Sequence, residues 1–279
     1  MPELPEVETV VQDLRKSGIE GLHFQSAQAF WPKTIETSSP QVFDQQIKNR
    51  QIQAISRRAK FIVFELAPTG WLLVHLRMTG RLDLFSKDSP LDAHVRIRST
   101  LSDGRELRFT DIRKFGRWYF YENEPPQFST LGPEPLSTAF TPNVLAQKLS
   151  HSKRQIKPLL LDQTTVSGLG NIYVDEALWQ AQIHPVTASN QLNDQSIACL
   201  HKAIIDVLKK GIRNSGTTLG KTALNYYSVG KRRGENQEAL QVFRKTGLPC
   251  PRCGSVIERL IVSQRSSHVC LQCQKPPKS

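Results

Sequence analysis

Two groups at the start of the chain could do covalent chemistry together. Pro2 follows the initiator methionine. A small second residue such as proline is normally compatible with removal of that methionine, which would leave Pro2 with a free secondary amine. An α-amino group titrates at about pH 8, so roughly a tenth is unprotonated at neutrality and can attack a sugar or carbonyl carbon to give an iminium. Glu3 is placed to exchange protons with the reacting group. An ordinary helix start explains Pro5, Glu6 and Glu8, but not Pro2.

Four of the five cysteines have the spacing of a structural metal site. Cys250 and Cys253 form one knuckle, and Cys270 and Cys273 form the second. Thiolates at i and i+3 on a tight turn converge on one metal, so the pattern predicts one structural zinc ion in a ribbon. Two disulfides are the alternative, and they would need an oxidising compartment, for which the chain carries no export signal. Cys199 lies on the apolar side of a helical stretch, and we expect it to be buried.

Size and charge narrow the class of protein. The chain has 279 residues, enough for two domains with substantial cores and a small appended module. No apolar run has the length of a membrane span, and the charged, proline-rich start does not resemble a signal peptide, so we expect an intracellular protein without a membrane partner. The formal charge is +12 and the pI is about 9.7, with basic residues in short clusters along the chain. Each cluster alone could be a solvated face, but the summed charge indicates nucleic acid as the partner.

The first half of the chain has the pattern of a β-sandwich with one helix at its start. Val7, Val10, Val11 and Leu14 form a helical stripe within residues 5–17. Short alternating segments follow and are typical of strands. They are residues 51–56, 61–66, 71–76, 95–101, 106–110 and 117–121.

The second half changes to helical periodicity. A proline-rich stretch ends the strand pattern, and we place a linker with the role of a hinge at residues 131–141. The expected helices are residues 144–150, 156–162, 172–180 and 196–214. The predicted organisation is α+β with two domains: residues 2–130 form the sandwich domain, residues 142–240 a helical domain with a mobile basic loop at 222–240, and residues 241–274 the ribbon.

The opening residues Met1-Pro2-Glu3-Leu4-Pro5-Glu6-Val7-Glu8 resemble those of the formamidopyrimidine-DNA glycosylase family, bacterial base-excision enzymes for oxidised purines. Further segments recur in family order and extend the resemblance to the last cysteine. They are Ser56-Arg57-Arg58-Ala59-Lys60, Asp111-Ile112-Arg113-Lys114-Phe115-Gly116, Gly168-Leu169-Gly170-Asn171-Ile172-Tyr173 and the cysteine ribbon. The resemblance implies an N-terminal β-sandwich with a flanking helix, a C-terminal helix-two-turns-helix domain and a zinc ribbon, acting on damaged double-stranded DNA.

The same resemblance assigns phosphate-binding residues. It implies that Asn171, in a glycine-rich turn that leads into a helix, contacts the phosphate at the lesion together with Lys157, whereas on sequence alone this is an ordinary turn. Lys60 would contact the DNA backbone and assist catalysis, although an edge-strand lysine fits the sequence equally well. Arg265, otherwise a surface arginine, would grip the phosphate next to the damaged nucleotide. The zinc would then aim this arginine, because four thiolates leave no open coordination site for chemistry.

An enzyme that excises a base must extrude the nucleotide and fill the space that it leaves. Met78 and Phe115 would ordinarily be interpreted as core residues. The family positions that they match imply the reverse, namely that Met78, Arg113 and Phe115 wedge into the base stack, with Arg113 facing the orphaned cytosine. The glycines that follow both apolar residues agree with loop tips.

We therefore expect a bifunctional DNA glycosylase and lyase in which Pro2 attacks the sugar, Glu3 transfers protons and Glu6 supports the site. The strand would be cleaved by β,δ-elimination through a Schiff base. We expect a monomer located in the bacterial cytoplasm with the nucleoid. One alternative is an endonuclease VIII-like glycosylase for oxidised pyrimidines, which usually has glycine at the place of Leu4. The other is a non-catalytic zinc-ribbon DNA-binding protein, which leaves Pro2 and Glu3 without a purpose.

Overall fold

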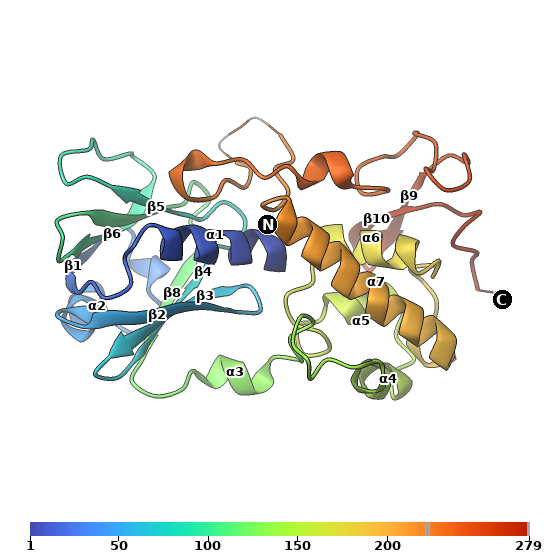
Figure 1. Cartoon of the computed structure of the whole chain (residues 1–279), viewed down its shortest axis with the longest axis horizontal. Coiled ribbons are helices and arrows are strands. Elements are labelled where there is room, and N and C mark those ends of the chain that lie inside the picture. Colours follow the sequence, from blue (N-terminus) through green and yellow to red (C-terminus); the bar gives the residue numbers. More distant parts are fainter. Residues whose placement is uncertain (221, 223, 278–279) are drawn as a thin grey trace. The chain divides into compact units, whose positions relative to one another are not determined.

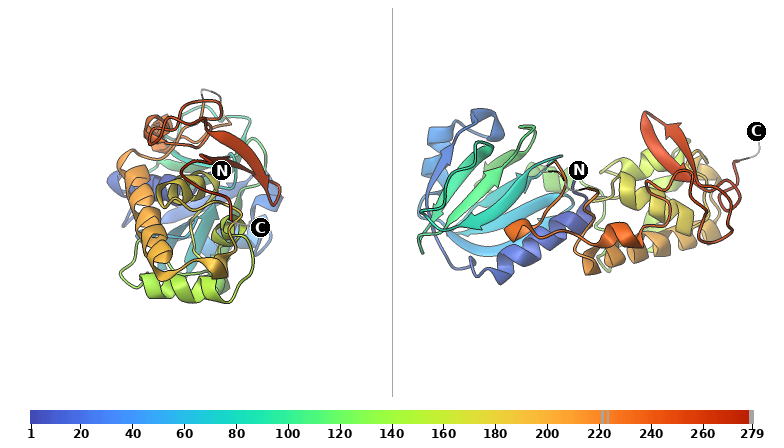
Figure 2. Two further views of the ribbon diagram at one scale, coloured as in Figure 1. Left: turned by 90° about the vertical axis from the view of Figure 1, so that its right-hand side faces the viewer. Right: turned by 90° about the horizontal axis from the view of Figure 1, so that it is seen from above.

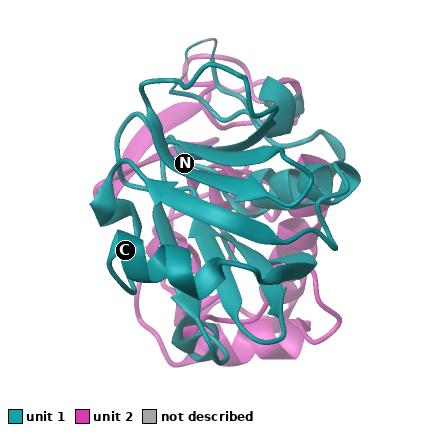
Figure 3. Cartoon of the chain, turned by 90° about the vertical axis from the view of Figure 1, so that its left-hand side faces the viewer, with its two compact units in different colours: residues 1–129, 212–237 teal, residues 130–211, 238–279 magenta. Residues whose placement is uncertain are grey.

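The computed structural model describes residues 1–220, 222 and 224–277. The chain forms two compact units, which Figure 3 shows in different colours. Unit 1 contains residues 1–129 and 212–237, and unit 2 contains residues 130–211 and 238–279. The two units are described separately below.

Unit 1 is a β-sandwich of two four-stranded antiparallel sheets, which confirms the predicted fold class (Figure 1). One sheet has the order β2-β3-β4-β8, from strands β2 (Gln51–Arg58), β3 (Phe61–Ala67), β4 (Trp71–His75) and β8 (Arg117–Tyr121). The other has the order β1-β6-β7-β5, from strands β1 (Phe24–Ala29), β6 (Val95–Leu101), β7 (Glu106–Thr110) and β5 (Arg81–Phe85). Alternate side chains of both sheets meet in one core that includes Phe64, Phe109 and Trp118.

Helix α1 (Leu4–Lys16) closes this core and packs on β2 and β3. Its predicted stripe of Val7, Val10, Val11 and Leu14 is buried. The helix ends at Lys16, with Ser17 as its C-cap and Gly18 just beyond in the left-handed region. The stripe fixes which face of the helix meets the sheet, and so fixes where the first residues of the chain lie.

Strands β1 and β5 and helix α2 are among the elements of unit 1 that were not expected from the sequence. Strand β1 has little alternation, because a bulge between Phe24 and Ser26 shifts its register against β6. Helix α2 (Pro40–Ile47) buries only Phe43 and Ile47, and Ser39 caps it by accepting a hydrogen bond from the Val42 amide. Strand β5 is short and buries Asp83 beside its leucines. The 3₁₀ helix Pro32–Thr34 and the short helix α3 (Pro126–Thr130) complete the first 130 residues.

Unit 2 is helical and ends in a hairpin. Its helices are α4 (Pro142–Ser150), α5 (Ile156–Leu161), α6 (Asn171–Gln180) and most of α7 (Asp194–Arg213), with a 3₁₀ turn at Ser189–Gln191. Strands β9 (Glu258–Val262) and β10 (Arg265–Val269) pair in the C-terminal ribbon, which lies beside helix α6 (Figure 2). The prediction for Cys199 was wrong, because the buried face of α7 contains Ile197, Leu200 and Ile204, and Cys199 lies exposed outside it.

Residues 212–237 belong to the same unit as the sandwich, although they begin in the last turn of α7. No local pattern predicts this packing, because several of their partners lie about two hundred residues upstream in helix α1. The predicted loop 222–240 falls partly here, and its residue 223 lies outside the described residues. The described part contains 3₁₀ turns at Val229–Lys231 and Asn236–Ala239, and several hydrogen bonds fasten it to helix α1 and strand β5.

No helix in the described part of the chain is long and apolar enough to cross a membrane.

Candidate functional site

The first residues of the chain form the cap of helix α1. Glu3 has extended backbone and is the N-cap residue, and its amide donates to Oε2 of Glu6 at 2.8 Å in a capping box. Glu3 is 3% exposed, Pro2 is buried, and Met1 is half exposed. The predicted nucleophile and proton carrier are therefore held at a defined helix start rather than in a frayed terminus.

Glu6 also fastens a distant segment to this helix start. Its other carboxylate oxygen, Oε1, accepts from the Thr217 amide at 2.8 Å. The Tyr226 hydroxyl donates to the backbone carbonyl of Glu6 at 3.2 Å. Gly216, in the left-handed region, fits here because a Cβ would lie 2.9 Å from Cγ of Glu6. One buried carboxylate thus bridges the backbone of Glu3 and that of Thr217.

Lys60 lies in the two-residue turn that joins β2 and β3. Ala59 takes the left-handed conformation there, and Lys60 is only 5% exposed. His75 in β4 is close by, because it pairs with Phe61, the residue that follows Lys60. Burial, followed by the charges of Arg77 and Lys60, lowers the pKa of His75 to about 3. His75 is therefore neutral at physiological pH. Its Nδ1 accepts the Arg77 amide at 3.0 Å, which leaves the proton on Nε2 as a donor.

Met78, Arg113 and Phe115 come together at the surface of unit 1. Met78 is 40% exposed and Phe115 is 45% exposed, so the interpretation of both as core residues does not hold. The Arg113 guanidinium lies 4.8 Å from the Phe115 ring centre, and its Nη1 lies 3.0 Å from the Met78 sulfur. Two apolar side chains and one planar cation therefore share one exposed cluster, as an element that enters a base stack requires.

Buried Asp111 holds the loops that carry this cluster. Its Oδ1 accepts from the Thr79 hydroxyl and, at 3.2 Å, from the Arg113 amide, and its Oδ2 accepts from the Gly116 amide at 2.7 Å. Gly116 must be glycine, because a Cβ would lie 2.3 Å from the ring of Phe109. Asp111 was part of a family segment, but nothing in the sequence assigned it this role.

Replacing Asp111 with alanine should lower the free energy of unfolding by about 2–3 kcal/mol, because several buried donors lose their acceptor. Urea unfolding followed by tryptophan fluorescence measures this. Asp103→Ala is the matched control, because Asp103 lies in a partly exposed ion pair with Arg105; we expect a change below about 0.5 kcal/mol there. Equal unfolding midpoints for Asp111→Ala and wild type would contradict the role given to Asp111.

The four predicted cysteine ligands converge in unit 2. The sulfurs of Cys250, Cys253, Cys270 and Cys273 all lie within 4.8 Å of one another. The Cys250–Cys273 and Cys253–Cys270 sulfur distances are 3.9 and 3.4 Å. A tetrahedral zinc with bonds of about 2.3 Å needs sulfurs about 3.8 Å apart, so these residues fit the ion. The Trp179 indole N–H points at the Cys250 sulfur at 3.4 Å and orients it.

The backbone carbonyl of Ser266 in β10 accepts hydrogen bonds from two predicted DNA-binding residues. Lys157 Nζ donates to it at 2.6 Å and Asn171 Nδ2 at 3.0 Å. Lys157 is fully buried, and its Nζ also pairs with Asp175 Oδ1 at 2.6 Å. Asp175 Oδ2 in turn accepts from the His268 amide at 3.0 Å. In this arrangement Lys157 positions the hairpin, and a direct contact of Lys157 with a phosphate stays a prediction.

Arg265 begins β10 directly after the tight turn of the hairpin. Ser263 and Gln264 both have positive φ, as a two-residue hairpin turn requires. Arg265 is exposed, and its guanidinium has no ion-pair partner among the residues that the structure describes. Its backbone is fixed by pairing with Val262, so the metal ribbon presents this arginine from a rigid hairpin.

Family models match most of the chain. The formamidopyrimidine-DNA glycosylase N-terminal domain matches residues 1–118, and the H2TH domain of the same enzymes matches residues 131–222. The zinc finger found in FPG and IleRS matches residues 247–276. The chain belongs to the formamidopyrimidine-DNA glycosylase family. The matched zinc finger and the four clustered thiolates together show that this family member holds one structural zinc ion.

Relatives share this similarity over their full length. The chain is 48% identical to a formamidopyrimidine-DNA glycosylase of Protochlamydia amoebophila, covering 99% of this chain and 100% of the relative. It is 47% identical to one of Herpetosiphon aurantiacus, covering 98% and 100%. A Lactococcus lactis FPG mutant in complex with Fapy-dG-containing DNA has a TM-score of 0.91 and 39% identity, covering 99% and 100%. The Lactococcus lactis Fpg with abasic-site DNA has a TM-score of 0.90 and 38% identity, covering 98% and 100%.

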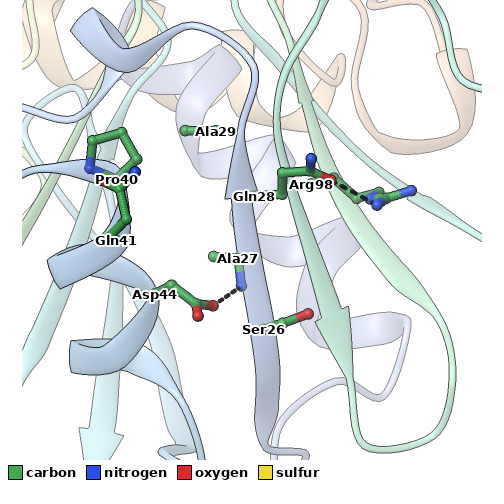
Figure 4. A pocket seen from close by; sticks show the side chains of 8 residues that line it. All are labelled: Ser26, Ala27, Gln28, Ala29, Pro40, Gln41, Asp44 and Arg98. Atoms are coloured by element: carbon green, nitrogen blue, oxygen red, sulfur yellow. Dashed lines mark hydrogen bonds between the residues drawn. The ribbon is translucent and has the colours of Figure 1, made fainter.

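A hollow of about 460 Å³ lies elsewhere in unit 1, between β1 and α2 (Figure 4). Its carboxylate, Asp44, accepts from the Ala27 amide at 2.5 Å, and Arg98 donates to the Gln28 side chain at 2.7 Å. Asp44 therefore fastens α2 to the edge strand β1, and Arg98 joins β6 to the same strand. No thiol or amine lies among its lining residues.

Sequence reasoning missed four residues that the structure connects to the site. His75 lies beside Lys60, Asp111 holds the exposed cluster, Asp175 fastens the ribbon, and Asp13 fastens residues 228–232. Asp111 opens a quoted family segment and Asp175 follows the glycine turn, so their places were visible but their partners were not. His75 and Asp13 carried no signal, because one polar residue in an apolar strand or helix has no distinctive spacing.

Proposed function

We propose that this protein is a base-excision repair DNA glycosylase that removes oxidised purines and cleaves the strand as an abasic-site lyase. The observation that carries the proposal is full-length similarity to enzymes named formamidopyrimidine-DNA glycosylase, combined with Pro2 and Glu3 at the start of α1. The complexes of Lactococcus lactis Fpg with Fapy-dG and abasic-site DNA support damaged duplex DNA as the substrate.

In this proposal Pro2, freed of Met1, is the nucleophile. Its amine attacks C1′ of the damaged nucleotide, the glycosidic bond breaks, and the base leaves with a proton. The C1′–O4′ bond then breaks, with a proton going to O4′, and the opened sugar is left as an iminium on the Pro2 nitrogen. This iminium acidifies C2′–H, and loss of that proton expels the 3′ phosphate; a second elimination then expels the 5′ phosphate. Glu3 carries protons at the sugar and in these eliminations, because its buried carboxylate lies one residue from the amine.

Both units contribute residues to the proposed DNA contacts. Lys60, Asn171 and Arg265 would bind the backbone phosphates, and the exposed cluster of Met78, Arg113 and Phe115 would fill the space left by the everted nucleotide. Neutral His75 lies beside Lys60 and is suited to donate a hydrogen bond to the same DNA backbone. Binding should weaken steeply with salt, because several phosphates are neutralised.

Residues 131–141 would act as a hinge, the enzyme would act as a monomer, and Glu6 would support the catalytic start of α1. The relatives are bacterial DNA glycosylases, and bacterial DNA lies in the cytoplasm, which supports a cytoplasmic location and, more finely, association with the nucleoid.

Borohydride trapping on three duplexes tests the function. We expect a covalent adduct with a duplex that contains 8-oxoguanine opposite cytosine, because the iminium is reducible, and none with the undamaged duplex. Denaturing electrophoresis and intact mass identify the adduct. An adduct on thymine glycol alone would indicate an endonuclease VIII-like enzyme. No adduct on any duplex would indicate a DNA-binding protein without catalysis.

A further inference from the structure

Asp13 lies in helix α1, three turns from Glu3, and the proposed mechanism does not use it. Its carboxylate accepts from Arg232 Nη2, with 2.6 Å to Oδ1 and 2.7 Å to Oδ2, and Oδ2 also accepts from the Ser228 hydroxyl. The Asp13 side chain is 12% exposed, and that of Arg232 is 47% exposed. Three charge-assisted hydrogen bonds therefore join α1 to residues 228–232.

Glu6 and Asp13 face the same side of α1, because seven residues make two helical turns. They lie about 10 Å apart along the helix axis. Glu6 binds Thr217 and Tyr226, and Asp13 binds Ser228 and Arg232. The described residues of 216–236, here called the clamp segment, are therefore fastened at two points, Glu6 and Asp13, to α1, which we call the catalytic helix.

The clamp segment has a near limb, which contains Thr217 and Thr218, and a far limb, residues 226–236. These two limbs are also joined to each other. The Thr218 hydroxyl donates to the Tyr226 carbonyl at 2.8 Å and accepts from the Gly234 amide at 2.8 Å. Asp83 in strand β5 accepts from the Gly230 amide at 2.8 Å, which fixes the far limb to the sandwich. A shift of this limb would therefore reach Thr217, and through the Glu6 carboxylate it would reach the backbone of Glu3.

We propose that Asp13 is a positioning residue that, through Arg232 and Ser228, holds the clamp segment against the catalytic helix and that base excision depends on it. This inference rests on the proposed function. Base excision depends on it more than cleavage at an abasic site does, because the clamp segment borders the helix start where the damaged nucleotide reacts. A nucleotide with a base needs that border in place, whereas an abasic sugar has no base to hold.

Limited proteolysis tests the fastening without relying on activity. Trypsin cuts after Lys231, Arg232 and Arg233, and a fastened limb resists it because cleavage requires local opening. We expect Asp13→Asn to be cut at these sites about tenfold faster than wild type. Glu122→Gln is the matched control, because Glu122 pairs with Arg50 at 2.6 Å elsewhere in unit 1. Equal cutting of Asp13→Asn and wild type would overturn the inference.

Single-turnover kinetics on two substrates test its consequence. For Asp13→Asn we expect excision of 8-oxoguanine to slow by about tenfold or more and cleavage of a preformed abasic site to change by less than about twofold. Adding Arg232→Gln to Asp13→Asn should change excision little further, because the pair is already broken. An equal loss on both substrates, or no loss on either, would overturn the inference. Wild-type protein that neither excises nor forms a trapped adduct would overturn the proposed function instead.

Discussion

Replacing Pro2 with glycine should slow excision of 8-oxoguanine by at least about a hundredfold, measured as a single-turnover rate. Glycine leaves a primary amine without the ring that fixes the direction of the nitrogen lone pair, so the amine no longer meets C1′ in one orientation. Borohydride trapping on the same duplex should fall in parallel. Intact mass must first show that Met1 has been removed from both proteins.

Glu3→Gln is the informative partner of this variant. It keeps the amine of Pro2 and the helix cap, because a glutamine side chain still reaches the N3 backbone. It loses the group that exchanges protons, so excision should fall by about 10²–10⁴ while damaged DNA is still bound. Full-speed excision by protein that retains Met1 would contradict the assignment of Pro2 as the nucleophile.

Removing the zinc should weaken DNA binding strongly, which is the second large effect that we expect. We expect Cys253→Ser, or treatment with a chelator, to weaken binding to an abasic-analogue duplex by at least about a hundredfold, because binding of the ion supplies the folding free energy of such ribbons. The apolar cluster under the ribbon contains few residues besides the cysteines, mainly Trp179, Val242 and Ile257, so apolar packing contributes little to holding it. Arg265 would lose its rigid hairpin, and Asn171 its partner at Ser266.

Cys199→Ser is the control for this experiment, because Cys199 is exposed and far in sequence from the four ligands. It should bind DNA and zinc as wild type does. Fluorescence anisotropy measures the affinity, and elemental analysis measures the metal. The sandwich of unit 1 should keep its thermal transition in both variants, because it contains no cysteine. Tight binding of DNA by the zinc-free protein would contradict the role given to the ribbon.

The elements with a regular pattern were predictable from the sequence. The Val7–Leu14 stripe located helix α1, alternation located most strands of the sandwich, and the cysteine spacing located the metal site. These patterns are local, because each reflects one face of one element against one core. The resemblance to the family then supplied candidate residues such as Lys60 and Arg265, which no local pattern marks.

The long-range contacts were not predictable. Helix α2 and strand β1 bury too few side chains to show a period. The packing of residues 212–237 with the sandwich depends on hydrogen bonds to Glu6, Asp13 and Asp83, each a single carboxylate far away in the chain. The loops of Met78 and Phe115 depend on Asp111 in the same way. One acidic residue in a sequence does not reveal which distant amides it will accept.

The cap of helix α1 has a consequence for how the enzyme matures. The helix begins at Leu4, its cap is Glu3, and Met1 lies half exposed outside both. The chain can therefore fold before an aminopeptidase removes Met1. If Pro2 is the nucleophile, newly made chains would already recognise lesions while still inert, and they would shield those lesions from processed copies. Overproduction beyond the capacity for methionine removal should then lower the repair obtained per molecule.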